Sequence, residues 1–138
     1  MKGAAVLRLE KRYTDEMISH ALADNPNECC GILAGAGGQV TRLYRGLNVA
    51  KNPVMRYDLD PRDLLRIYRD IETNGWDVFG IYHSHTHTQA YPSATDVELA
   101  FWPDSIYFIV SLQDVARPAL RAFRLRDGLV EEETLEIV

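Results

Sequence analysis

The stretch Val78-Phe79-Gly80-Ile81-Tyr82-His83-Ser84-His85 runs from a short apolar segment into two histidines separated by one serine. The β-branched and aromatic bias of residues 78–82 is typical of a buried strand, so both histidines are expected at its C-terminal end. Because side chains alternate between the two faces of a strand, His83 and His85 should point to one side and Ser84 to the other. Two imidazoles held in this way can share one metal ion.

A turn and a helix start follow the histidines. Pro92-Ser93 marks the turn, and Ser93 with Asp96 three residues later is typical of the first turn of a helix, here expected to reach about Phe101. This helix brings the Asp96 carboxylate back toward the end of the strand. Two histidines, one carboxylate and an open position for water form the ligand set of a catalytic zinc site.

These residues also allow simpler interpretations. A Ser-x-x-Asp sequence starts many helices that bind no metal. Ser93 is compatible with an N-cap and with a donor to a developing oxyanion. His87 continues the alternation and would give a three-histidine site, but the polar segment 86–91 favours a position outside the ligand set.

Hydrolysis at such a site requires a carboxylate that moves a proton. A zinc ion with an open position lowers the pKa of bound water to about 7, and the carboxylate passes the released proton to the leaving amine. Glu28 is the candidate, because it is the one carboxylate at the head of the small, apolar strand expected at residues 28–35. Burial there would raise its pKa; a surface charge at a strand end is the alternative.

Length and composition favour one domain, 1–138. With 46% hydrophobic residues, 138 residues can bury one core but are too few for two typical domains. Fifteen basic against 20 acidic side chains give a net charge of -5, and without a basic cluster we expect no nucleic-acid binding. The apolar piece 4–7 is too short for a signal peptide or a membrane span, so we expect no membrane association and a cytoplasmic protein.

The two cysteines, Cys29 and Cys30, are adjacent and match neither a disulfide framework nor a CxxC metal site. We expect two small buried residues in a reducing compartment. The alternative is a thiol enzyme in which one of them is a nucleophile paired with a histidine.

The rest of the chain predicts an α/β fold: a single compact domain with a mixed central β-sheet flanked by about three helices. Strands are expected at residues 5–10, 28–35, 39–47 and 106–110, on both sides of the Asp127-Gly128 turn, and as a short edge strand near 55–58. Helices are expected from Thr14 to about Asp24, with His20 in solvent, and after the Asp60-Pro61 start signal. The second of these should bury Leu64, Leu65, Tyr68 and Ile71.

These residues resemble the JAMM family of zinc metalloproteases, also called the MPN-plus domain. The family motif is a Glu, then His-Ser/Thr-His, seven residues, Ser, two residues and Asp. It maps onto Glu28, His83-Ser84-His85, Ser93 and Asp96 with every spacing satisfied. The resemblance covers nearly the whole chain and implies a fold related to cytidine deaminases. It also implies one zinc ion bound by His83, His85 and Asp96, with Glu28 as general acid/base and Ser93 as oxyanion donor.

Within the family, the segment from His83 to Ser93 is most similar to small bacterial members that remove an amino acid, notably cysteine, or a short tail from ubiquitin-like sulfur-carrier proteins. Thr86 stands where many members carry proline, a difference that concerns the loop and not the ligand set. Only ten residues separate Asp96 from Tyr107, too few for the insertion with which deubiquitinating relatives grip ubiquitin.

The resemblance therefore implies a zinc peptidase that hydrolyses a peptide or isopeptide bond at the C-terminal Gly-Gly tail of a ubiquitin-like or sulfur-carrier protein. The alternative is a non-catalytic MPN-type module that only recognises such a partner. The presence of Glu28 and Ser93 favours the enzyme. The sequence leaves the oligomeric state open, with a dimer among the options.

Overall fold

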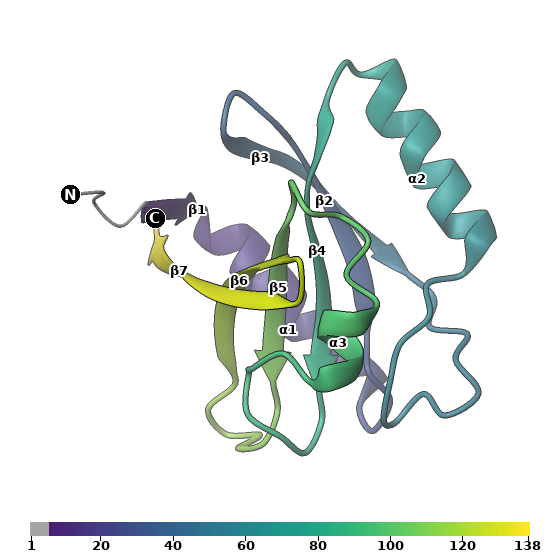
Figure 1. The fold of residues 1–138 in the computed structure, drawn as a ribbon, viewed down its shortest axis with the longest axis vertical. Coiled ribbons are helices and arrows are strands. Elements are labelled where there is room, and N and C mark those ends of the chain that lie inside the picture. Colours follow the sequence, from purple (N-terminus) through teal and green to yellow (C-terminus); the bar gives the residue numbers. More distant parts are fainter. Residues whose placement is uncertain (1–5) are drawn as a thin grey trace.

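A curled seven-stranded sheet forms the centre of the structure, a computed structural model that describes residues 6–138 (Figure 1). The strands lie in the order β1-β7-β6-β5-β4-β2-β3. Their bounds are β1 Val6–Leu9, β2 Cys30–Ala36, β3 Gln39–Gly46, β4 Asp77–His85, β5 Ile106–Ser111, β6 Ala119–Arg126 and β7 Leu129–Ile137. The helices are α1 Lys11–Asp24, α2 Pro61–Thr73 and α3 Ala94–Glu98.

The sheet is mixed, as predicted. β4 pairs with β5 and β1 with β7 in parallel, whereas the other neighbours are antiparallel. The predicted fold class, a mixed sheet with three helices, is confirmed. None of the helices formed by residues 6–138 is long and apolar enough to cross a membrane.

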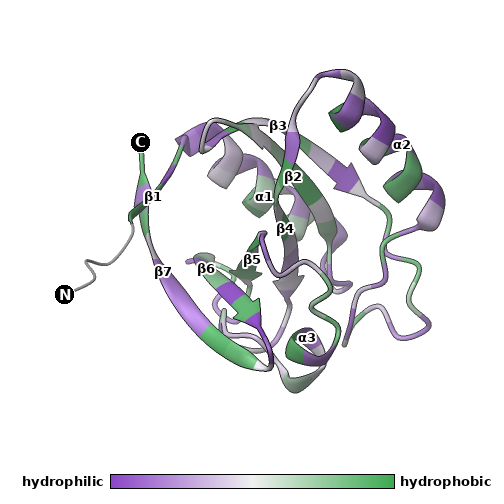
Figure 2. Ribbon diagram, turned by 45° about the horizontal axis from the view of Figure 1, so that its top comes forward, coloured by the Kyte–Doolittle hydropathy of each residue, from purple (hydrophilic) through white to green (hydrophobic). Residues whose placement is uncertain are grey.

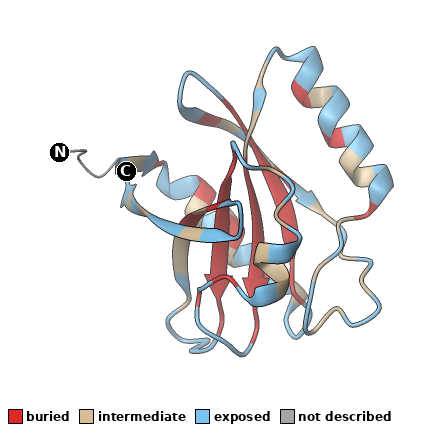
Figure 3. Ribbon diagram, in the orientation of Figure 1, coloured by how far each residue is buried: buried red, intermediate tan, exposed pale blue. Residues whose placement is uncertain are grey.

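The two faces of the sheet bury different helices, because side chains alternate along each strand. Tyr82 and Phe108 lie on the face covered by α1, which contributes Met17 and Ala21. The opposite face is divided between α3 and α2. Ile81, Tyr107 and Ile109 pack near α3, while Ile32 packs against Ile67 and Ile71 of α2. The central strands are almost entirely buried (Figure 3), so β4 is a rigid support for its last residues.

The outer strand β7 is hydrophilic along much of its length (Figure 2). Its acidic run is paired with arginines of β6: Arg121 with Glu132 and Arg124 with Glu133, each at 2.6 Å. Because side chains alternate along a strand, these two ion pairs lie on opposite faces of the outer part of the sheet.

Helix α1 differs from its predicted form. It begins at Lys11, three residues before the predicted cap Thr14, and Glu10 occupies the N-cap position. His20 was expected in solvent, which is wrong: its side chain lies on the buried face with Met17 and Ala21. Its Nδ1 is 2.7 Å from the Tyr82 hydroxyl and its Nε2 is 3.2 Å from Asp24 Oδ2. Both ring nitrogens thus have polar partners in the interior.

Helix α2 buries a different set of residues from the predicted one. Ile67 and Ile71 are buried, whereas Leu65 is 52% and Tyr68 is 37% exposed. The prediction that Leu65 and Tyr68 are buried is therefore wrong. The Tyr68 ring instead stacks on Trp102 with 5.3 Å between ring centroids.

The segment between β3 and α2 forms no edge strand, so that prediction is also wrong. Residues 48–59 are an irregular loop with a single isolated bridge between Asn48 and Leu59. Helix α3 ends at Glu98, before the predicted Phe101. Both segments lie beside the ends of β4 and β2, where the candidate site is found.

Candidate metal centre and active site

The two histidines at the end of β4 point to the same side, as predicted. His83 pairs with Cys30 of β2 and Ile109 of β5, which fixes its backbone on both sides. The Nε2 atoms of His83 and His85 are 3.2 Å apart. Asp96 Oδ2 lies 3.2 Å from His83 Nε2 and 3.0 Å from His85 Nε2. The structure therefore brings three potential metal-ligating side chains to one point.

A capping box at the start of α3 places the Asp96 carboxylate. The backbone N–H of Ser93 donates to Asp96 Oδ2 at 2.9 Å, and the N–H of Asp96 donates to Ser93 Oγ at 3.1 Å. The Ser93 hydroxyl accepts in this box and keeps its own hydrogen, because a hydroxyl has one donor and two acceptor positions. The N-cap interpretation of Ser93 is confirmed, and it leaves a donor role open.

The hydrogen bonding of His85 suits a metal ligand. Its Nδ1 lies 2.9 Å from the carbonyl oxygen of Gln89, which can only accept, so Nδ1 carries the hydrogen. A neutral His85 therefore presents a bare lone pair at Nε2. When both rings are neutral, the three converging atoms of His83, His85 and Asp96 share at most one hydrogen. A cation satisfies all of them, and two imidazole nitrogens with one carboxylate oxygen form a donor set that zinc accepts.

The charges of this cluster support each other. Burial by itself would raise the pKa of Asp96, but the neighbouring His83 and His85 outweigh it and hold that pKa well below its usual range. Burial would lower the pKa of His85, yet the hydrogen bonds to Asp96 and to the Gln89 carbonyl raise it overall. Asp96 is therefore ionised, the state in which a carboxylate can bind a metal ion.

Glu28 lies next to the cluster without belonging to it. Its side chain is 6% exposed, so the alternative of a surface charge at a strand end is wrong. Burial raises its pKa to about 8, and the charges of His85 and Asp96 also act on it. Its carboxylate is not part of the three-atom group formed by the metal-ligating side chains. This is the arrangement expected of a proton-transferring group.

Ser84, between the two histidines, ties β4 to the segment that carries Glu28. Its hydroxyl accepts from the N–H of Cys29 at 2.8 Å, and its own N–H donates to the Cys29 carbonyl at 3.2 Å. The residue that points away from the candidate metal thus fixes the neighbour of Glu28. Histidine and carboxylate positions are coupled through one buried serine.

His87 lies outside the cluster. Its side chain is exposed, and its Nδ1 is 2.8 Å from the hydroxyl of Thr86. Thr86 is buried and its hydroxyl donates to the carbonyl of Val54 at 3.4 Å, a long bond toward the loop 48–59. The geometry therefore favours Asp96 over His87 as the third ligand.

The cysteines are buried, as predicted. Cys29 and Cys30 are both 0% exposed. Burial raises the pKa of Cys29 to about 12 and raises that of Cys30 above its usual range. Neither side chain has the lowered pKa of a nucleophilic thiolate.

Two residues of the site carry no signal in the sequence. The ring of Tyr57 stacks on that of His83, with centroids 4.5 Å apart. The Asn48 side chain donates to the Glu28 carbonyl at 2.9 Å. Both come from the irregular loop 48–59, whose residues follow no periodic pattern. The sequence therefore could not predict that they lie near the end of β4.

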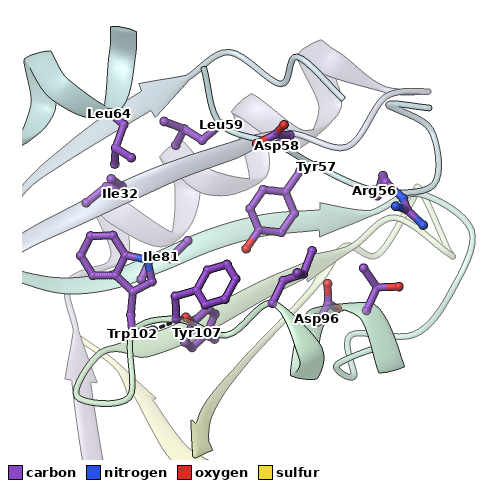
Figure 4. A pocket seen from close by; sticks show the side chains of 13 residues that line it. Ile32, Arg56, Tyr57, Asp58, Leu59, Leu64, Ile81, Asp96, Trp102 and Tyr107 are labelled. Atoms are coloured by element: carbon purple, nitrogen blue, oxygen red, sulfur yellow. Dashed lines mark hydrogen bonds between the residues drawn. The ribbon is translucent and has the colours of Figure 1, made fainter. Parts of the chain in front are cut away.

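A cavity of about 190 Å³ opens beside the cluster and includes Asp96 in its wall. Figure 4 shows Asp96 and Arg56 at one end of it and Trp102 at the other. The rest of the lining is largely apolar and includes Ile32, Leu59, Leu64, Ile81 and Tyr107, with Asp58 as a further charged residue. An extended, weakly polar segment of a substrate would fit this lining.

Residues 10–126 match the family described as prokaryotic homologs of the JAB domain. The chain belongs to this family. It is 41% identical to the CysO-cysteine peptidase of Mycobacterium tuberculosis over 135 residues, which cover 96% of this chain and 92% of that protein. It is also 43% identical to the desampylase of Haloferax volcanii over 111 residues, covering 76% of this chain and 80% of the relative.

Solved structures agree with this assignment to the JAB family. The solution structure of DSY2949 from Desulfitobacterium hafniense superposes with a TM-score of 0.84 at 36% identity, covering 97% of this chain and 93% of that one. AF2198 of Archaeoglobus fulgidus, described as a JAB1/MPN domain protein, superposes with a TM-score of 0.64 over 97% of this chain and 99% of its own, at 19% identity, which shows a common fold. The JAMM resemblance is confirmed, and the chain is a hydrolase of the JAMM type.

Proposed function

We propose that this chain is a zinc-dependent peptidase that cleaves after the C-terminal Gly-Gly of a ubiquitin-like or sulfur-carrier protein and releases the attached residue, with cysteine as the leading candidate. The observation that carries the proposal is the convergence of His83, His85 and Asp96, with Glu28 buried beside them but outside the ligand set. Relatives named CysO-cysteine peptidase and desampylase support a substrate of this class.

The residues of the chain have separate tasks in this reaction. When bound, zinc would polarise the scissile carbonyl and make water acidic enough to attack near pH 7. Glu28 accepts a proton from the attacking water and delivers it to the departing nitrogen. Because burial raises the pKa of Glu28 to about 8, both of its protonation states are accessible near neutral pH. The free hydrogen of the Ser93 hydroxyl is donated to the oxyanion.

The cavity beside Asp96 would hold the carrier tail. A Gly-Gly end has no side chains, so it can lie close to the backbone where residues of the loop 48–59 and of α3 line the cavity. In this proposal the apolar walls contact the residues before the two glycines, and the carrier approaches from the end of the cavity at Trp102, opposite Asp96.

The test is hydrolysis of a carrier whose tail ends in Gly-Gly-Cys, by wild type and by Glu28→Gln. We expect Glu28→Gln to lower kcat by about 10²–10⁴-fold, because it removes the proton-transferring group. Zinc content, measured on the same samples, should stay at the wild-type level. Glu98→Gln is the matched control, since Glu98 is an exposed carboxylate at the end of α3. Near wild-type turnover by zinc-loaded Glu28→Gln would refute the assigned role.

A further inference from the structure

Arg56 is the one cationic side chain among the residues that line the cavity beside Asp96. Figure 4 shows its side chain at the same end of the cavity as Asp96, opposite Trp102. Its positive charge acts on Glu28 and favours the ionised form of that carboxylate. Arg56 therefore lies at the end of the cavity that is next to the candidate metal ligands, away from the apolar end at Trp102.

The guanidinium of Arg56 is available to a ligand. The side chain is exposed. Most arginines of the chain form ion pairs, yet within the part that the structure describes no carboxylate lies within 4.0 Å of Arg56. The other charged residues of the cavity lining, Asp58 and Asp96, are acidic, so Arg56 is the group there that can attract an anion. An arginine without an ion-pair partner is suited to bind a carboxylate, which it can hold with two parallel hydrogen bonds.

The backbone of Arg56 is fixed relative to Glu28. The side-chain amide of Asn48 donates to the carbonyl of Glu28 at 2.9 Å and to the carbonyl of Arg56 at 3.0 Å. The N–H of Glu28 donates to the carbonyl of Pro53, in the same loop, at 2.7 Å. One amide and one backbone bond thus hold the loop against the catalytic segment, so a free guanidinium extends from a fixed position.

We propose that Arg56 binds the free α-carboxylate of a single residue attached after Gly-Gly, and thereby selects a C-terminal amino acid as leaving group over the lysine side chain of an isopeptide. This inference rests on the proposed function. Water adds to the glycine carbonyl, the C–N bond breaks, and the proton taken up by Glu28 goes to the amine of the released amino acid. In that amino acid, one carbon separates the amine from the carboxylate, so a guanidinium whose charge acts on Glu28 can bind the carboxylate while the amine receives the proton. The lysine side-chain amine that an isopeptide releases has no carboxylate one carbon away.

The test compares two synthetic peptides that end in Gly-Gly-Ala, one with a free C-terminal carboxylate and one with a C-terminal amide. Wild type should cleave the acid with a kcat/KM on the order of 10–100-fold above that for the amide, since hydrogen bonds to charged groups contribute this much. Arg56→Ala should lose this preference by slowing on the acid alone. Arg56→Lys should keep part of it, because it retains the charge without the paired donors. Lys51→Ala, an exposed cation of the same loop outside the cavity, is the control and should keep the full preference.

Equal cleavage of acid and amide by wild type would overturn the role of Arg56 and leave the peptidase intact. An equal loss on both peptides in Arg56→Ala would do the same, since it would mean a general effect on the site. Failure of the zinc-loaded wild type to cleave either peptide or a Gly-Gly isopeptide would overturn the proposed function, and this inference with it.

Discussion

Glu28 is buried beside the metal-ligating group without belonging to it, and its burial raises its pKa. The folded pKa is about 8 against an ordinary value of 4.5. Between these values the unfolded chain ionises Glu28 while the folded chain keeps it protonated. Stability from this residue is therefore fully present below about pH 4.5 and is lost as the pH rises toward 8.

The consequence can be measured on metal-free protein by urea unfolding of wild type and Glu28→Gln. Relative to wild type, Glu28→Gln should gain up to about 1.4 kcal/mol of unfolding free energy for each pH unit between the two pKa values. A difference that does not change with pH would show that Glu28 titrates normally in the folded protein. Glu98→Gln, with an exposed carboxylate, should show no such trend.

The reactivity of Cys29 and Cys30 distinguishes the metal mechanism from a thiol mechanism. Both side chains are inaccessible and burial raises the pKa of each, so iodoacetamide should leave the native enzyme fully active. A chelator should remove the activity, and zinc should restore it. Inactivation by iodoacetamide at a rate that exceeds global unfolding would favour the thiol enzyme.

The residues of the site differ in how far the sequence could predict them. His83, His85, Ser93 and Asp96 lie within fourteen residues, so strand alternation and a helix start suffice to bring them together. Arg56 and Tyr57 belong to a loop without a period, and no local rule places them. The prediction of His20 in solvent was wrong because which face of a short helix turns toward a sheet depends on packing. Here the contact with Tyr82 buries His20.

At the scale of elements, the loop 48–59 replaces the edge strand expected near residues 55–58. Pro53 has no N–H to donate to a strand partner, which excludes a central strand here but allows an edge strand, and the segment forms neither. The loop is ordered by Asn48, whose amide oxygen accepts from the N–H groups of Ala50 and Asp58, each at 3.0 Å. This side chain thus adds to the backbone hydrogen bonds of the loop, such as that from the N–H of Val49 to the carbonyl of Asp58 at 2.8 Å.

Asn48→Ala should therefore affect both stability and catalysis. It leaves the carbonyls of Glu28 and Arg56 without this donor, and we expect a loss of about 2–4 kcal/mol in unfolding free energy together with a reduced kcat. Asn74→Ala is the matched control, since its amide bonds only the exposed end of α2. If Asn48→Ala were no more destabilising than Asn74→Ala, the loop would not depend on this side chain.

Helix α2 shows why burial on a helix is harder to predict than its existence. Asp60 and Pro61 correctly marked its start, and the Asp60 side chain accepts from the N–H of Arg62 at 2.8 Å. The apolar residues occupy more than one face, so the sequence could not decide between Leu65 and Ile67. Packing against the sheet buries Ile67, which lies in one apolar cluster with Ile32 of β2.

At the scale of the molecule, the sheet order puts the site at one end of the central strands. β4 lies between the antiparallel neighbour β2 and the parallel neighbour β5. Its last residues therefore lie beside Glu28, which precedes β2, and the loop after β4 leads into α3. The class of fold followed from the alternation of strands and helices. The order of seven strands, with β1 next to β7, depends on contacts between distant segments and was not predictable. A single domain over 1–138 and a cytoplasmic location stay predictions.

The most direct test of the metal centre is zinc content, measured by elemental analysis of protein purified without added metal. Wild type should contain about one zinc per chain, and His83→Ala and Asp96→Ala should each lose it, because each removes one of the three converging side chains. His87→Ala should keep it, since His87 is exposed and outside the cluster. Full occupancy in Asp96→Ala would contradict the assigned ligand set and favour a three-histidine site. Absence of zinc from every sample, even after reconstitution, would contradict the metallopeptidase account as a whole.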